Sequence, residues 1–317
     1  MKLIERICFP TDFGKSSEVA LKSVVSIAKK FGSEVNLVHV LPESMDFDKI
    51  QGFVNDKLAD YVKLLEAEGV KSTANLLHGN HADLLVSFAE RKKANLIVLG
   101  AGHIGKEKFK LGTNSEKIIR NASVPVWVIE KENVAIPNLV LCPIDFSDES
   151  MLALDSAIHL CRLFESELHL IHAVKRIDAQ YGEWGVDIAV EQAKMVKELE
   201  VELEDLTDQL DLNGITWSKS VILGDPAGAI LDVIKNENID LLMMASSGKG
   251  TLKRFFLGSV AERVSRKVPC SFIINKSKGM IHLKLDKGIT DIEAIYEDGL
   301  ELAKQGFVQE AIIEWKR

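Results

Sequence analysis

The chain has 317 residues, of which 46% are hydrophobic and 27% are charged, and its formal net charge is −8. This composition is typical of globular proteins, and at about 150 residues per domain the length predicts two domains. The negative charge argues against a dedicated nucleic-acid binder, because neutralising phosphates requires a basic surface. No apolar run approaches the roughly 18 residues that span a bilayer, and the first residues lack a signal-peptide core. We therefore expect no membrane partner and a cytoplasmic location.

The first part of the chain alternates short apolar runs with amphipathic stretches. The amphipathic stretches predict helices, and the runs rich in Val, Ile and Leu predict buried parallel strands. Alternating strands and helices with short links predict a parallel sheet with helices on both faces. The strands are expected at 3–9, 34–41, 72–77, 95–100 and 125–130, and the helices at 17–31, 56–69, 83–93 and 113–121.

The second part of the chain repeats the first. The run RICFPTD ending at Asp12 returns as VLCPID ending at Asp145, and the strand ending in His39-Val40 returns as one ending in His172-Ala173. An insertion after the second strand of this copy carries a long helix predicted at about 187–212. We expect domains at 1–132 and 138–276, the second with strands at 138–142, 167–174, 216–223, 240–245 and 270–275.

The repeat fails in the tail at 277–317. Residues 280–285 alternate like a strand, and the segment 294–315 resembles one tetratricopeptide repeat, with small residues Gly299 and Ala311 where two helices would touch and Gly306 in the turn. A single repeat cannot bury its own apolar face. The tail is therefore interpreted as a helical hairpin that docks on the preceding domain or on a second chain, with a peptide-binding array as the alternative.

A glycine-rich turn follows the fourth strand of the second copy. The chain reads SSGKGT at 246–251, and a helix is predicted to begin after Gly258-Ser259. Glycines let backbone N–H groups approach phosphate oxygens, and a helix N-terminus adds unpaired donors and partial positive charge. Ligands of open parallel sheets bind at this edge, outside the carboxyl ends of the strands. The turn therefore predicts an anion site.

The spacing Ala245-x2-Gly248-x9-Gly258-Ser259 closely resembles the G-x2-G-x9-G-[ST] ATP loop of universal stress proteins. The Asp after the first strand, the His-Val or His-Ala ending of the second strand and Gly-Asp-Pro226 are also similar to that family. The resemblance covers about residues 1–275. It implies an α/β fold of two tandem open, parallel-sheet, Rossmann-like (adenine nucleotide alpha hydrolase-like) domains, followed here by the short helical tail. The chain departs from the family at Ala245, where a positive φ would cost about 1–2 kcal/mol.

The resemblance implies ATP as the ligand, with or without Mg²⁺, or else ADP or AMP. Asp145, with Pro143 and Ile144, would contact adenine and ribose. The backbone of Ala173 would pair with the adenine edge, and Met244 would cover the base. The expected phosphate and ribose ligands, with their neighbours in the loop, are Ala245, Gly248, Lys249, Gly250, Gly258, Ser259, Val260 and Ala261.

The first copy keeps less of this pattern. Its loop is one residue shorter, and His103 stands near the second loop glycine position. We expect weaker nucleotide binding here, or a site retained only as scaffold. The candidate residues are Pro10, Thr11, Asp12, Val40, Gly100, Gly102, Gly112 and Thr113.

Three other patterns point elsewhere but are incomplete. The stretch 100–106 fits the start of a Walker A loop, but Glu107 stands where a Mg²⁺-binding Ser or Thr is required. The motif that begins at His103 lacks the second His of nucleotidyl transferases. His78, His81 and His103 lie on loops expected to be neighbours, yet no carboxylate or Cys stands at a metal-binding spacing, so we expect no metal.

Two further sets of residues are interpreted as structural. His39 and His172 recur in register at strand ends, where hydrogen-bonded histidines are common. The cysteines are scattered without a CxxC pair and are expected to be reduced, small apolar residues; they are Cys8, Cys142, Cys161 and Cys270.

These patterns predict a tandem universal stress protein that binds adenine nucleotide mainly in its second domain and acts as a stress-response regulatory module. A slow ATPase or phosphotransferase, with Asp145 orienting a water, and a nucleotide-free scaffold acting through the tail are the alternatives. The apolar last strands, 125–129 and 271–274, are expected to pair antiparallel as they do in the family, forming an internal pseudo-dimer. We also expect a homodimer through the tail or the long helix, and an unidentified protein partner at the loop 246–257.

Overall fold

The computed structural model describes residues 4–102, 111–130, 136–248 and 257–276. The predicted loop residues Lys249 and Gly250 and the whole predicted tail, 277–317, lie outside the described residues.

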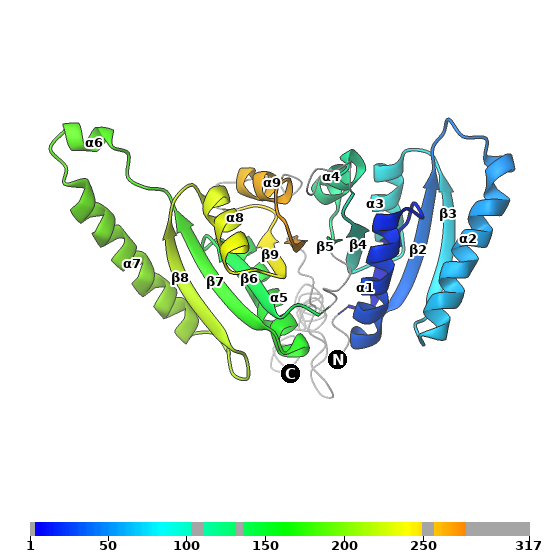
Figure 1. Cartoon of the computed structure of the whole chain (residues 1–317), viewed down its shortest axis with the longest axis horizontal. Helices are drawn as coiled ribbons and strands as arrows, with labels where there is room; N and C mark the ends of the chain where they lie inside the picture. The colour runs from blue at the N-terminus through cyan, green and yellow to red at the C-terminus, as the bar shows by residue number, and fades with distance from the viewer. Residues whose placement is uncertain (1–3, 103–110, 131–135, 249–256, 277–317) are drawn as a thin grey trace, which may run out of the picture.

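Each half of the chain alternates strands with helices (Figure 1). The first half consists of β1 (Arg6–Pro10), α1 (Lys15–Phe31), β2 (Glu34–Leu41), α2 (Phe47–Ala67), β3 (Ser72–His78), α3 (His81–Arg91), β4 (Leu96–Gly100), α4 (Thr113–Asn121) and β5 (Val126–Ile129). The second half consists of β6 (Leu139–Ile144), α5 (Asp148–Phe164), β7 (Glu167–Val174), α6 (Gln180–Glu183), α7 (Ile188–Asp208), β8 (Trp217–Leu223), α8 (Pro226–Asn236), β9 (Leu241–Ala245), α9 (Ser259–Ser265) and β10 (Ser271–Asn275).

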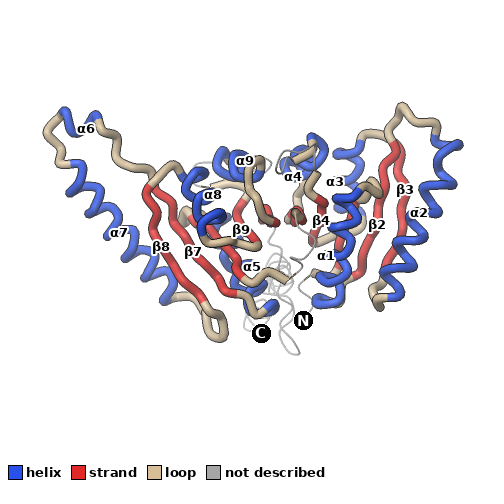
Figure 2. The backbone as a smooth tube through the Cα atoms, in the orientation of Figure 1, coloured by secondary structure: helices blue, strands red, loops and turns tan. Residues whose placement is uncertain are grey.

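The strands of the described chain form one continuous sheet in the order β3-β2-β1-β4-β5-β10-β9-β6-β7-β8 (Figure 2). Neighbouring strands within each half are parallel. The halves meet through β5 and β10, which are antiparallel and place Trp127 opposite Ile273. The α/β class, the parallel sheet of each half and the antiparallel pairing of the last strands are therefore confirmed.

Two apolar layers cover the two faces of this sheet. One contains buried side chains of α1, α2, α5 and α7, and the other contains those of α3, α4, α8 and α9. Both layers run through both halves of the chain. On the first face, the rings of Phe31 and Phe164 meet edge to face at 5.7 Å between centroids, joining α1 to α5. The carboxyl edge of the sheet stays open for the loops that precede the helices.

The helix after the second strand is equally long in both halves. Both α2 and α7 have 21 residues. We predicted that the first of them begins at Asp56, but it begins at Phe47, because Phe47, Ile50 and Val54 extend its apolar face toward the N-terminus. The long helix is therefore not the inserted part of the second half, and the extra residues lie in the connections on either side of α7, chiefly at 175–187. At the outer end of the molecule α7 projects with α6, and only Leu203 and Thr207 of α7 are buried (Figure 1).

The cysteine thiols are free and buried, as predicted. Burial raises the pKa of Cys8 and of Cys161 to about 12, so both thiols are protonated at neutral pH. Among the helices of the described residues, none has the length and apolar character needed to cross a membrane.

Candidate functional site

A tight turn follows the first strand of each half and holds an aspartate in place. After β6, Phe146 adopts a left-handed φ of 58°. This turn directs the N–H of Ser147 to Asp145 Oδ1 at 3.1 Å, and the Ser147 hydroxyl donates to the same oxygen. The backbone N–H of Asp145 donates in turn to Ser150 Oγ at 3.3 Å. Because one carboxylate oxygen is occupied by this turn, the orientation of the Asp145 side chain is fixed at the open edge of the sheet.

The histidine near the end of the second strand of each half packs against this turn. His172 Nδ1 lies 2.9 Å from the carbonyl oxygen of Ile144, and its ring packs against Phe146 with centroids 4.9 Å apart. In the first half His39 Nδ1 lies 2.7 Å from the Thr11 carbonyl, and its ring stacks on Phe13 at 4.9 Å. Both histidines are hydrogen-bonded at strand ends, as predicted.

The connection from β9 to α9 forms the opposite wall. The N–H of Gly258 donates to the carbonyl of Ser246 at 2.7 Å and so joins the two ends of this connection. Gly258 is the N-cap of α9 and makes no side-chain capping bond. The N–H groups of the first turn of α9 have no partner within the helix and are donors at this edge.

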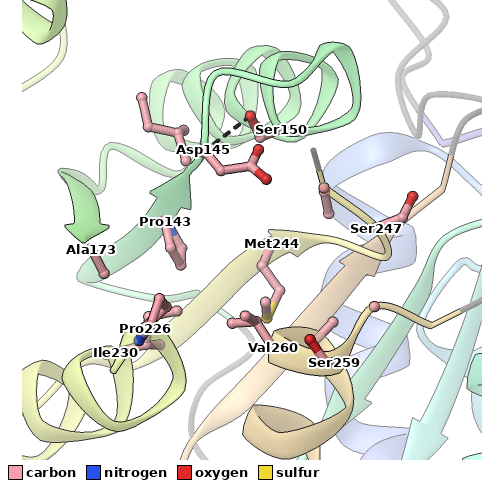
Figure 3. A pocket seen from close by; sticks show the side chains of 15 residues that line it. Pro143, Asp145, Ser150, Ala173, Pro226, Ile230, Met244, Ser247, Ser259 and Val260 are labelled. Atoms are coloured by element: carbon pink, nitrogen blue, oxygen red, sulfur yellow. Dashed lines mark hydrogen bonds between the residues drawn. The ribbon is translucent and has the colours of Figure 1, made fainter. Parts of the chain in front are cut away.

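A cavity of about 240 Å³ lies between these two walls (Figure 3). Asp145 and Ser150 lie on one side, Ser259 and Val260 lie on the other, and Met244 lies between them. Every described residue that we predicted for the second site borders this cavity. The lining consists of Pro143, Ile144, Asp145, Ser150, Ala173, Pro226, Ile230, Met244, Ala245, Ser247, Gly248, Gly258, Ser259, Val260 and Ala261.

Gly248 lies directly against the carboxylate of Asp145. A Cβ added to Gly248 would be 2.0 Å from Asp145 Oδ2, a distance that real side chains do not reach. The second glycine of the motif is therefore required for close approach of the backbone to this carboxylate. Ala245, which replaces the first glycine, is not among the described residues with positive φ. The cost of a left-handed alanine does not arise at this position.

The rim of the cavity is held by an ion pair between α8 and α9. Arg263 donates two hydrogen bonds to Asp225, at 2.9 and 2.7 Å, and Asp225 also caps α8 by accepting the Gly228 N–H at 3.1 Å. Hydrogen bonding from Arg263 and then from Gly228 lowers the pKa of Asp225. Asp225 adjoins Pro226, and Arg263 follows the first turn of α9, so this bridge links α8 to α9 beside the cavity.

Comparison with known proteins identifies the family of this site. The model of the universal stress protein family matches residues 4–130 and 138–276. The chain belongs to the universal stress protein family. A universal stress protein of Methanocaldococcus jannaschii is 36% identical over 142 residues, which are 41% of this chain and 84% of that protein. Universal stress protein YxiE of Bacillus subtilis is 32% identical over 146 residues, which are 43% of this chain and 97% of that protein.

A solved structure shares the fold over most of the chain. The universal stress protein from Archaeoglobus fulgidus DSM 4304 matches 86% of this chain and 98% of its own, with 23% identity and a TM-score of 0.65. A likeness of this extent concerns the fold of both universal stress protein domains together.

In the first universal stress protein domain α1 lies close against the end of β4. A Cβ added to Gly100 would be 2.4 Å from the backbone oxygen of Ser16, so the first turn of α1 rests on the end of β4. In the second domain Ala245 carries a real Cβ at this register, and α5 must therefore stand further away.

The other first-domain candidates follow the same turn chemistry. Gly14 N–H and the Ser17 hydroxyl donate to Asp12 Oδ1 at 2.9 and 2.6 Å. Burial raises the pKa of Asp12, but these bonds and the nearby His39 lower it more, so the carboxylate is the favoured form. The structure buries Thr11 and Val40, leaves Pro10, Gly100 and Gly102 partly exposed and leaves Thr113 exposed, while Gly112 caps α4.

Among the described residues, no group of three His, Cys, Asp or Glu side chains is close enough to hold a metal ion. His103 and the predicted Walker-like residues after it lie outside the described residues.

Four lining residues of the second site were not predicted: Ser150, Pro226, Ile230 and Ser247. A signal existed for two of them. Ser150 recurs in register with Ser17 of the first copy, and Pro226 belongs to the Gly-Asp-Pro motif that the resemblance rests on. Ile230 and Ser247 carry no sequence signal, because only the packing of α8 and the path of the loop bring them to the cavity.

Proposed function

We propose that the second domain binds an adenine nucleotide, ATP in the first place, in the cavity beside Asp145, and that the chain is a nucleotide-binding regulatory module. The observation that carries this proposal is the arrangement of one anchored carboxylate, an apolar centre and a set of N–H and hydroxyl donors around a single cavity. Membership of the universal stress protein family supports the same reading.

Each part of the cavity suits one part of a nucleotide. The Asp145 carboxylate borders the cavity and suits the hydroxyl groups of a ribose, which are donors. Met244, Val260 and Ile230 form apolar surfaces that suit the faces of a base. The Ser259 hydroxyl and the first-turn N–H groups of α9 suit phosphate oxygens.

The donors are sufficient for useful affinity. A hydrogen bond to a charged group contributes about 1.5–3 kcal/mol, and micromolar binding corresponds to about 8 kcal/mol. A few such bonds to the phosphates, together with burial of the base against Met244, therefore support micromolar binding. Lys249 and Gly250, which lie outside the described residues, are further proposed phosphate ligands.

The cavity offers little for rapid hydrolysis. Among the described residues its lining contains one carboxylate, Asp145, and no histidine or lysine, whereas general acid–base catalysis needs a positioned group whose pKa suits proton transfer. We therefore favour binding over turnover. In this proposal bound ATP orders the loop 246–257 and so changes the surface that a protein partner meets; equal protease cleavage of that loop with and without Mg-ATP would contradict this.

The first test asks whether the purified chain holds a nucleotide. Heat-denatured protein is expected to release a compound absorbing near 260 nm, and titration calorimetry with ATP is expected to show binding. Asp145→Ala should weaken ATP binding by about tenfold or more, the effect of losing one hydrogen bond of about 1.5 kcal/mol. Asp12→Ala, the matched change in the first domain, should leave the affinity unchanged.

The alternatives predict other outcomes. No heat with ATP, ADP or AMP, and no released nucleotide, would reject the proposal and favour a scaffold that acts through residues 277–317. Phosphate release that is lost in Asp145→Ala would favour a slow ATPase. A homodimer through the tail or α7 is a separate prediction, which light scattering of the full chain checks.

A further inference from the structure

The first domain has a histidine at the position where a proline borders the cavity of the second domain. His81 is the first residue of α3, and Pro226 is the first residue of α8; both helices have 11 residues. The adjacent strand ends correspond as well. Val40 is paired with Leu77 between β2 and β3, as Ala173 is paired with Ile222 between β7 and β8.

In the first domain these two positions contact each other. The His81 ring lies near enough to the Val40 backbone for that backbone to raise the pKa of the ring. Val40 is only 4% exposed, whereas Ala173 is partly exposed and borders the cavity together with Pro226. In the second domain the space between the end of β7 and the start of α8 is open. In the first domain the His81 ring lies in the corresponding space, between the end of β2 and the start of α3.

The surroundings of His81 favour its neutral form. Burial of the ring, followed by the charge of the nearby His39, lowers the pKa of His81, and the Val40 backbone only partly opposes this. A neutral imidazole is a planar heteroaromatic ring with one N–H donor and one acceptor nitrogen. It therefore offers the backbone at Val40 the same kind of contact that the edge of adenine offers the backbone at Ala173 in the proposed complex.

We propose that His81 is an internal occupant of the base subsite of the first domain, and that the difference between His81 and Pro226 limits the chain to one adenine nucleotide. This inference rests on the proposed function of the second domain, because it assigns the base to the space beside Ala173 and Pro226. The first domain keeps Asp12, Gly112 and Thr113, which correspond to Asp145, Gly258 and Ser259 of the second domain.

The first experiment transfers the histidine to the second domain. Pro226→His should place an imidazole against Ala173 and weaken ATP binding in calorimetry by about tenfold or more, because a buried contact of the base is then blocked. Pro226→Ala is the control and should bind ATP as the native chain does. Unchanged affinity in Pro226→His would overturn the inference.

The second experiment removes the histidine from the first domain. Proline is favoured at the first position of a helix, and Asn80 before it has φ −70° and ψ 117°, an extended conformation compatible with a following proline. His81→Pro and His81→Ala should therefore fold. With 8-azido-ATP and light, the native chain should be labelled only within 138–276, and both variants should also be labelled within 4–130.

The outcomes separate this inference from the proposed function. Labelling of the first domain in the native chain, or no labelling of it in either His81 variant, would overturn the inference while leaving binding by the second domain intact. If the native chain binds no nucleotide but the His81 variants are labelled within 4–130, the inference stands and the proposal for the second domain fails.

Discussion

The side chain at position 248 controls how closely the loop approaches Asp145. Gly248→Ala would place a methyl group 2.0 Å from Asp145 Oδ2 and force the carboxylate to turn away. We expect ATP affinity to fall by about tenfold or more, or roughly 1.4 kcal/mol, measured by calorimetry. Gly112→Ala is the control, since no atom lies within 4 Å of its added Cβ. Equal affinities for the two variants would show that the contact has no part in binding.

Lys276 carries its amino group into a buried position between the halves. Nζ donates to the Ile119 carbonyl at 2.6 Å, and burial lowers the pKa from 10.5 to about 8. Between these values the unfolded chain binds a proton that the folded chain does not, so the free energy of unfolding rises with pH. The rise should be at most about 3 kcal/mol.

Lys276→Met provides the comparison. The difference in unfolding free energy between the native chain and this variant, measured by urea denaturation, should increase in favour of the native chain between pH 8 and 10.5. A constant difference across that window would mean that Lys276 titrates normally and is not buried as described.

Single residues show where sequence reasoning succeeded and where it stopped. The repeat identified Asp145, Gly258 and Ser259 because each stands at an element boundary, and the structure brings them to one cavity. The contact of His81 with Val40 was not predicted, because it depends on the angle at which α3 leaves its strand. The conformation of Ala245 was equally undetermined, since φ is set by the loop that follows.

At the scale of elements, α4 and α9 are linked by reciprocal ion pairs. Arg120 contacts Glu262 at 3.1 Å, and Arg266 contacts both Glu116 at 3.3 Å and Glu262 at 3.0 Å. Glu116 and Glu262 are each the fourth residue of their helix. The helices that follow the fourth strands of the two domains therefore meet across a pseudo-two-fold axis (Figure 1).

These ion pairs should make a small, salt-dependent contribution to the free energy of unfolding. Each exposed pair is worth about 0.2–1 kcal/mol, so Arg266→Gln, which breaks two contacts, should lower the unfolding free energy more than Arg120→Gln. The control is Lys63→Gln, which breaks the ion pair of Lys63 with Asp60; these side chains are 76% and 65% exposed. Both differences from the control should vanish in about 1 M salt, where the Debye length is near 3 Å; effects that persist there would contradict an ionic link.

The elements themselves were largely predictable. Strand positions followed from apolar runs, and α4 was expected at the residues where it occurs, 113–121. The start of α2 at Phe47 was missed, because Gly52 and the exposed Phe53 obscure the helical spacing of Phe47, Ile50 and Val54. The long helix of the second half was mistaken for the insertion, since helix length cannot be compared until both copies are seen.

At the scale of the whole molecule, the two domains share one sheet and meet at Trp127. This side chain is 0% exposed, and the residue pairs with Val98 on one side and Ile273 on the other. Trp127→Ala should lower the unfolding free energy by about 3–5 kcal/mol and affect both domains, as followed by circular dichroism.

Trp127→Phe should lower the free energy of unfolding by less than Trp127→Ala does. Trp127 Nε1 has no hydrogen-bond acceptor among the described residues, and a buried donor without a partner costs about 1–3 kcal/mol. Removing that donor offsets part of the lost packing. An equal loss for Phe and Ala would argue that Nε1 is satisfied and that the junction is packed differently.

The joined sheet was predicted from the two apolar last strands and the family resemblance. The first domain keeps less of the loop pattern, from which we expected weaker nucleotide binding there. The close approach of the Ser16 backbone to Gly100 and of His81 to the Val40 backbone was not predicted. Both contacts join segments distant in the chain, and no local pattern encodes them.

The central claim is that the cavity of the second domain binds ATP, and hydrogen–deuterium exchange with and without ATP tests it most directly. We expect slower exchange in peptides covering 143–150 and 258–264, whose backbone lines the cavity, and unchanged exchange at 10–17 and 112–119 in the first domain. Unchanged exchange at 258–264 with saturating ATP, or protection confined to the first domain, would contradict the account.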